Sequence, residues 1–220
     1  MRNIVIFLAA LTPLALWSDS PTRAAEDDAT KAFFNGKDLE GWEGLIDQFW
    51  SVKDGAIVGT NGDKKVPFNT FLCSKKNYKD FELTFQIRLK DGEGNSGVQI
   101  RSKIFNREKF AVSGPQADIG QIFWGTLYGE HFSPDGKAES GFMKQADPKL
   151  VKKVLKPKDF NDYYIKCVGK HVTIKLNGET TVDDDFPRMP DVGIIAWQLH
   201  GDHVMEVTFK NIKFKDLSAK

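Results

Sequence analysis

The chain has 220 residues, and its 31 lysines and arginines nearly balance 30 aspartates and glutamates, which gives a formal net charge of +1. Such a balance provides no global field that would attract nucleic acid or an anionic membrane surface, so neither is expected as a partner. The two cysteines form no C-x-x-C motif and have no zinc-type spacing with histidine, which argues against a structural zinc site.

Residues 1–24 are predicted to be an export signal. Arg2 supplies a positive charge, an apolar run covers residues 4–17, and Thr22-Arg23-Ala24 offers a cleavage site with small residues at both ends. Pro13 interrupts a run that is already short for a membrane span, so the mature chain is expected to have none. We therefore expect export to the periplasm or the extracellular space, a short exposed lead-in at residues 25–30, and one domain at residues 31–217.

Most of the remaining chain shows the alternation of apolar and polar residues that is typical of strands. Asp54-Gly55 and Asn177-Gly178 carry hairpin-turn chemistry, and a lysine-rich segment at residues 147–155 is the one helix candidate. It follows a long loop at residues 129–145, and long ordered loops are often functional. Strands are predicted at residues 50–52, 56–59, 70–73, 81–90, 97–102, 116–120, 126–128, 163–168, 171–176, 179–182, 193–200 and 204–215.

About a dozen short strands with frequent turns predict an all-β fold, a sandwich of two antiparallel sheets. Cys73 and Cys167 both lie in apolar strand segments. In an oxidising compartment one disulfide between them is conceivable, but two buried free thiols fit these segments better.

Three strands carry paired polar residues at positions i and i+2, which point to the same face. One interpretation is an ordinary solvated face, but such a face is rich in long flexible charged side chains, as residues 82–90 are. The three pairs contain amides and no lysine, which suits a cleft for a polyhydroxylated ligand. The pairs are Gln99 with Arg101, Gln116 with Asp118, and Gln198 with His200.

Five motifs, in order, resemble the 3-keto-disaccharide hydrolase domain family across roughly residues 31–217. They are Phe-Asn-Gly-Lys-Asp-Leu with Gly-Trp at 34–42, Asn-Ser-Gly-Val-Gln-Ile-Arg at 95–101, Leu-Asn-Gly at 176–178, Gln-Leu-His-Gly at 198–201 and Phe-Lys-Asn-Ile at 209–212. The resemblance implies a concanavalin-like jelly roll with a concave carbohydrate-facing sheet, and cleavage of glycosides already oxidised to a ketone at sugar carbon 3. Two residues depart from the family pattern, Pro115 where an aromatic residue is common and Gly129 where an aspartate is common.

A 3-keto sugar sets a particular chemical task, because the ketone acidifies the hydrogen on carbon 2. His200 fits the base by its intrinsic pKa range, and Arg101 fits a stabiliser of the enolate. Asp118 could orient the imidazole or bind a divalent metal ion, whose requirement stays open. Glu130 or His131 could protonate the leaving oxygen. A conventional glycosidase needs two carboxylates across the scissile bond and stays an alternative, as does a noncatalytic carbohydrate-binding module.

The remaining candidates are expected to bind substrate. The glutamines suit sugar hydroxyls, Trp124 and Tyr128 could stack on a sugar ring or belong to the core, and His203 could lie at the rim of the cleft. Arg101, Gln116, Asp118, Gln198 and His200 are expected to converge on one concave face. The full substrate-binding set is Asn95, Gln99, Gln116, Trp124, Tyr128, His131, Gln198 and His203.

Overall fold

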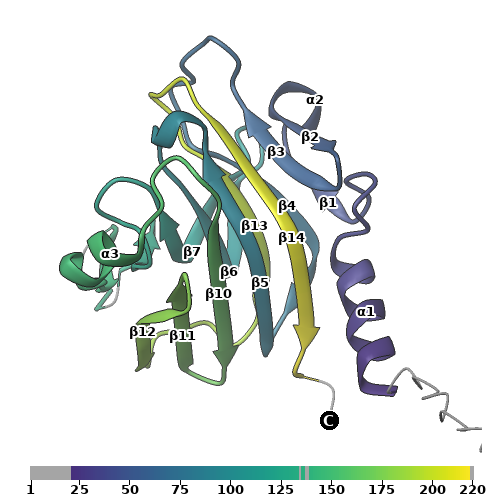
Figure 1. Cartoon of the computed structure of the whole chain (residues 1–220), viewed down its shortest axis with the longest axis vertical. Coiled ribbons are helices and arrows are strands. Elements are labelled where there is room, and N and C mark those ends of the chain that lie inside the picture. The colour runs from purple at the N-terminus through teal and green to yellow at the C-terminus, as the bar shows by residue number, and fades with distance from the viewer. Residues whose placement is uncertain (1–20, 134, 137–138, 219–220) are drawn as a thin grey trace, which may run out of the picture.

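The protein folds into two antiparallel sheets that face each other, as the computed structural model shows for residues 21–133, 135–136 and 139–218 (Figure 1). Over these residues each sheet has seven strands. Sheet I has the order β1 (Trp42–Glu43), β4 (Thr70–Tyr78), β13 (Gly193–Leu199), β6 (Ser96–Asn106), β7 (Ala111–Ile119), β8 (Leu127–Glu130) and β9 (Gly141–Lys144). Sheet II has the order β12 (Glu179–Asp185), β11 (His171–Leu176), β10 (Asn161–Val168), β5 (Phe81–Leu89), β14 (Glu206–Asp216), β3 (Ala56–Thr60) and β2 (Trp50–Lys53). The predicted all-β jelly-roll sandwich is confirmed.

The core lies between the sheets because the strands alternate as their sequences predict. In β5 every second residue from Phe81 to Leu89 is buried, while the residues between them are partly exposed. From the other sheet, Trp197 packs edge-on against Phe85 with ring centroids 5.2 Å apart and lies 4.5 Å from Phe209. Burying one large apolar side chain stabilises the fold by roughly 1.5–3 kcal/mol, so this layer supplies most of the driving force.

Helix α1 (Pro21–Phe33) packs along β14, the strand beside which it lies in Figure 1. The Thr30 hydroxyl donates to the Phe214 carbonyl at 3.2 Å and accepts from the Phe214 N–H at 3.0 Å, and the Phe33 ring stacks on Phe214 at 4.4 Å. The segment expected to be a short exposed lead-in is thus helical and attached to sheet II. Residues 1–20 of the expected export signal lie outside the described residues, and its expected cleavage point after Ala24 falls within α1.

The shorter elements agree with the turn and capping signals. Helix α3 (Pro148–Val154) begins after Asp147, whose carboxylate accepts from the Lys149 N–H at 2.9 Å, and Pro148 occupies the first turn. Asn177 has a φ of +49° in the hairpin between β11 and β12. Helix α2 (Ile46–Phe49) and the 3₁₀ turn η1 (Lys90–Gly92) complete the helical segments among the described residues, none of which is both long and apolar enough to span a membrane.

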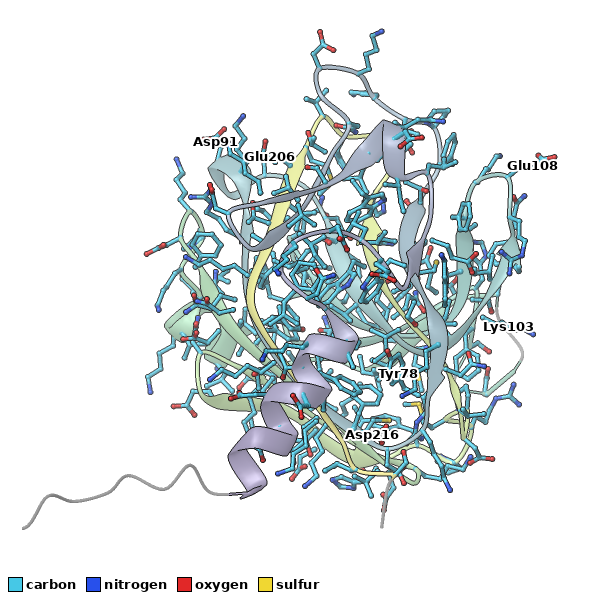
Figure 2. The ribbon with its side chains drawn as sticks, turned by 90° about the vertical axis from the view of Figure 1, so that its right-hand side faces the viewer. Tyr78, Asp91, Lys103, Glu108, Glu206 and Asp216 are labelled. Carbon is cyan, nitrogen blue, oxygen red and sulfur yellow. The ribbon has the colours of Figure 1, made fainter. Side chains whose placement is uncertain are left out.

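Two strands were not predicted, and several are longer than predicted, among them β4, which runs to Tyr78, and β12, which runs to Asp185. Strand β9 lies inside the segment 129–145 that was expected to be a loop, and β1 is a two-residue edge strand. Strands β6 and β7 extend by several residues into a long hairpin, whose tip is marked by Glu108 in Figure 2.

Cys73 in β4 and Cys167 in β10 belong to different sheets, and both are free and buried, as expected.

Candidate functional site

A β-bulge in β6 decides which polar side chains share the outer face of sheet I. Arg101 has a φ of +48°, and β6 pairs with β13 so that Gln99 faces Ala196 while Ser102 faces Ile194. Strand β6 therefore has one residue more than its partner over this stretch. The extra residue shifts the alternation, and Ser102 comes to lie beside Gln99. The expectation that Gln99 and Arg101 share a face is wrong.

Four side chains on the outer face of sheet I form a directed chain of hydrogen bonds, here called the amide row. The Ser102 hydroxyl donates to Gln99 Oε1 at 2.6 Å, Gln99 Nε2 donates to Gln116 Oε1 at 2.8 Å, and Gln116 Nε2 donates to Gln198 Oε1 at 3.3 Å. All four residues are buried. The row ends at Gln198 Nε2, which has no hydrogen-bond partner in the part of the chain that the structure describes.

This face is concave because sheet I curls over itself. Strands β4 and β7 are separated by β13 and β6 in the sheet order, yet Val112 of β7 packs in one cluster with Phe71 and Cys73 of β4. Ile104 and Phe110, at the base of the long hairpin, pack against the same cluster. The base of the hairpin thus packs on the outer face of sheet I, beside the amide row.

Asp118 lies two residues beyond Gln116 on the same face and is 3 % exposed. Burial raises the pKa of the Asp118 carboxyl well above its usual range, and the nearby Glu130 charge raises it further. The Ile119 N–H, which donates to Asp118 Oδ1 at 2.9 Å, opposes this shift without reversing it. The raised pKa extends the pH range over which this carboxyl group can act as a proton donor.

Glu130 is connected to the end of β13 through a residue that the sequence did not indicate, Asn69. Asn69 Nδ2 donates to Glu130 Oε1 at 2.9 Å, and the Gly201 N–H donates to Asn69 Oδ1 at 2.9 Å. Tyr128 precedes Glu130 by two residues and pairs with Gln116, which places it on the same face. Burial raises the pKa of Tyr128, with smaller contributions from the charges of Glu130 and Asp118.

His200 follows β13 directly and is half-buried. Its Nδ1 lies 2.7 Å from the Gly201 carbonyl oxygen, an acceptor, so Nδ1 carries the proton and Nε2 has the lone pair. The Gly201 amide is held by Asn69, so Glu130, Asn69, Gly201 and His200 form one connected network. The His203 ring lies 5.5 Å from the His200 ring, beside this network.

Arg101 lies apart from the site, at one end of the sandwich. Its guanidinium donates to the carbonyls of Lys79 and Gly169, to the Pro190 carbonyl at 3.0 Å and to Asp80 Oδ1 at 2.7 Å. It therefore links three segments through hydrogen bonds: the turn between β4 and β5, the turn between β10 and β11, and the segment before β13. Its hydrogen bonds go to the backbone and to Asp80, and the expected convergence with His200 does not occur.

Two further candidates lie outside the concave face. Trp124 is buried in the core between the sheets, which removes it as a stacking surface. Asn95 is buried in the turn before β6, next to Ser96, whose hydroxyl donates to the Gln198 carbonyl at 2.7 Å.

His131 is exposed and lines the same pocket as Asn69 and Glu130, at the rim of the site. Its Nδ1 lies 2.9 Å from Glu139 Oε1.

The two departures from the family pattern face each other. Pro115 pairs with Gly129 across β7 and β8. An ideal Cβ at Gly129 would lie 1.6 Å from the Phe132 carbonyl oxygen, so the backbone after β8 leaves no room for an aspartate there. Despite these changes, Gln116 and Glu130 keep their places in the amide row and in the Asn69 network.

Among the described residues, no group of three or more His, Cys, Asp or Glu side chains is placed to hold a metal ion. The functional groups gathered on the concave face are one imidazole, two carboxyl groups and a set of amides. This set can move protons and bind hydroxyl or carbonyl oxygens through its own side chains.

Comparison with known proteins agrees with this architecture. Residues 29–215 match the family model described as 3-keto-alpha-glucoside-1,2-lyase-like domain. A "putative glycosyl hydrolase" from Parabacteroides distasonis ATCC 8503 is similar in structure, with 24% identity, a TM-score of 0.60, and coverage of 84% of this chain and 93% of that one. The carbohydrate-binding module CBM66 from Bacillus subtilis has 16% identity, a TM-score of 0.59, and coverage of 80% and 96%. No curated protein matches the sequence.

Proposed function

Because the chain belongs to the 3-keto-alpha-glucoside-1,2-lyase-like domain family, we propose that it is an enzyme that cleaves 3-keto-glycosides, including 3-keto-disaccharides. The observation that supports the proposal is that a candidate base, His200, and a candidate acid, Asp118, lie on the same concave face. The contact of His200 Nδ1 with the Gly201 carbonyl leaves Nε2 to act as the base, while burial raises the pKa of the Asp118 carboxyl and favours its acid form. A base and an acid on one face are what enolate chemistry needs.

His200 Nε2 removes the proton from carbon 2 of the 3-keto sugar. The electron pair of that bond passes to the carbon 3 oxygen as an enolate, then returns to form the double bond between carbons 1 and 2 as the bond from carbon 1 to the leaving oxygen breaks. The leaving oxygen takes up a proton from Glu130. Water then adds across the double bond: its hydroxyl group goes to carbon 1, the proton held by His200 goes to carbon 2, and the remaining proton of water restores Glu130, which gives net hydrolysis. Nucleophilic attack by a carboxylate is not required at any step.

The enolate needs a partner other than Arg101, whose guanidinium is committed to the end of the sandwich. We assign this role to the protonated Asp118 carboxyl and to Gln198 Nε2, the donor at the end of the amide row. Glu130, held by Asn69, lies near Asp118 and is assigned to proton transfer at the leaving oxygen.

The same proposal includes export, in line with the N-terminal signal predicted for residues 1–24. Expression of the full chain in a bacterium, cell fractionation and mass determination of the mature N-terminus test this part. Retention of residues 1–24 on a cytoplasmic protein would contradict it.

The decisive experiment compares 3-keto-glucosides with their unoxidised parents. We expect release of the leaving group only from the keto compounds, because the parent sugars have no carbonyl to stabilise a carbon 2 anion. In deuterated water, NMR on a keto substrate with a poor leaving group should show exchange at carbon 2. Equal cleavage of keto and parent sugars would indicate a conventional glycosidase. Sugar binding without turnover would indicate a noncatalytic carbohydrate-binding module.

Two histidine variants separate catalysis from folding. His200→Gln should lower turnover by roughly 10²-fold or more, the usual range for a lost acid/base group. His171→Gln is the matched control, because His171 lies on sheet II between the carboxylates of Asp185 and Asp183, at 2.9 and 3.0 Å, far from the proposed chemistry. Unchanged turnover in His200→Gln would exclude His200 as the base.

A further inference from the structure

The amide row continues across sheet I into a surface of aromatic side chains. Strand pairing sets Gln99 opposite Gln116, Gln116 opposite Tyr128, and Tyr128 opposite Phe142, so these residues form one line across β6, β7, β8 and β9. Exposure increases along the line from 0% at Gln99 and 1% at Gln116 to half-buried Tyr128 and 43% at Phe142. The line thus changes from buried polar groups to an exposed apolar edge.

Four residues make up this edge, called here the aromatic patch: Ile122, Phe123, Tyr128 and Phe142. Phe123 and Phe142 stack at 5.6 Å with an interplanar angle of 17°, and Tyr128 meets both rings edge-on, at 5.8 and 5.6 Å. Ile122 is 70% exposed beside them in sequence. A single exposed apolar side chain is ordinary, but three rings packed on one another next to a polar face mark a binding surface.

The aromatic patch has few groups that could form a hydrogen bond with a sugar hydroxyl. Phenylalanine and isoleucine have no hydrogen-bonding atoms, and the Tyr128 hydroxyl interacts with the Ser140 side chain. A second sugar ring could stack its C–H face on these rings but would leave its hydroxyls without polar partners in the patch, whereas a flat aromatic group needs only ring faces and edges. The chemistry of the patch therefore favours an aromatic group.

We propose that the aromatic patch is the subsite for the leaving group and that it takes an aromatic aglycone. This inference rests on the proposed cleavage of 3-keto-glycosides and adds a substrate class to it. The sugar would lie over the concave face near Gln116, Asp118 and Gln198, and the aglycone would extend over Tyr128 towards Phe142. Aryl glycosides would then be favoured over alkyl glycosides and disaccharides.

Binding can be measured without turnover, which keeps this test separate from the test of the reaction. Unoxidised phenyl glucosides of both anomers and the matching methyl glucosides are titrated into the full-length protein and followed by NMR. Wild type should bind the phenyl compounds more tightly than the methyl compounds. Phe142→Ala should weaken phenyl glucoside binding by about 2- to 12-fold, the range for one lost aromatic pair, and leave methyl glucoside binding unchanged.

Two further variants complete the test. Phe160→Ala on the outer face of sheet II, where Lys210 Nζ lies 3.5 Å from the ring centroid, is a matched control that should change neither affinity. Phe142→Tyr keeps a ring at the patch and should restore phenyl binding. Equal affinity of wild type for phenyl and methyl compounds would overturn the proposal. So would a change of oligomeric state in Phe142→Ala without loss of phenyl binding, which would assign the patch to contacts between copies.

Discussion

Replacement of Arg101 by methionine should destabilise the fold and leave the chemistry intact. The change removes an ion pair of 2.7 Å with Asp80 and leaves the carbonyls of Gly169 and Pro190 without their donor. The Arg101 side chain is fully buried and that of Asp80 is 19% exposed. Breaking a buried pair by removing one partner costs about 3–5 kcal/mol. For a chain of this size that loss corresponds to a decrease in Tm of about 6–20 °C.

Urea unfolding followed by tryptophan fluorescence measures the loss, and turnover per folded molecule is measured on a 3-keto-glucoside. Arg107→Met is the matched control, because Arg107 also pairs with a carboxylate, Glu43 at 3.0 Å, but with a side chain that is 70% exposed. It should change the free energy of unfolding by no more than about 1 kcal/mol. If Arg101→Met kept its stability but lost turnover by about 10²-fold, Arg101 would act on the substrate and the structural role would be refuted.

Three further outcomes follow from the site and the core. Burial raises the folded-state pKa of Asp118 above the unfolded value, so wild type loses stability as pH rises above about 4, the unfolded value. Asp118→Asn removes this loss, so in urea titrations its free energy of unfolding relative to wild type should increase as pH rises above that value. Asn69→Ala should lower turnover by about tenfold and alter its pH profile, because Glu130 and Gly201 lose their shared partner; an unchanged profile would make Asn69 merely structural. Neither Cys73 nor Cys167 should react with a thiol reagent before unfolding, since burial raises the pKa of both thiols.

The strands could be predicted well because their evidence is local. In β5 the alternation from Phe81 to Leu89 is complete, and a strand with one buried face has little freedom of register. The pairs in β7 and at the end of β13 also followed from alternation, which correctly placed Gln116 on the face that binds Gln198. A prediction from alternation is wrong beyond a bulge, because the bulge adds a residue to one strand. The bulge at Arg101 contains neither glycine nor proline, so the sequence gives no signal of it.

The contacts that complete the site depend on distant parts of the chain. Asn69 is 61 residues from Glu130 and 132 from Gly201, and nothing in its local sequence indicates either partner. Their meeting requires the curvature of sheet I, across which Val112 and Phe71 share one apolar cluster. Helix α1 was missed for a different reason, because the export signal predicted for residues 1–24 overlaps its first turn.

The direction of the amide row has a consequence for substrate choice. Each glutamine between Ser102 and Gln198 accepts on its oxygen and donates from its nitrogen, so reversing one amide would set two like groups against each other. Leaving a buried donor or acceptor unpaired costs about 1–3 kcal/mol, so the three amides share one direction. In the direction described, Gln198 has its N–H donor at the end of the row. A ketone oxygen can only accept a hydrogen bond, whereas a hydroxyl group also brings a hydrogen that needs an acceptor, so under the proposed function this donor would favour the oxidised sugar over its parent.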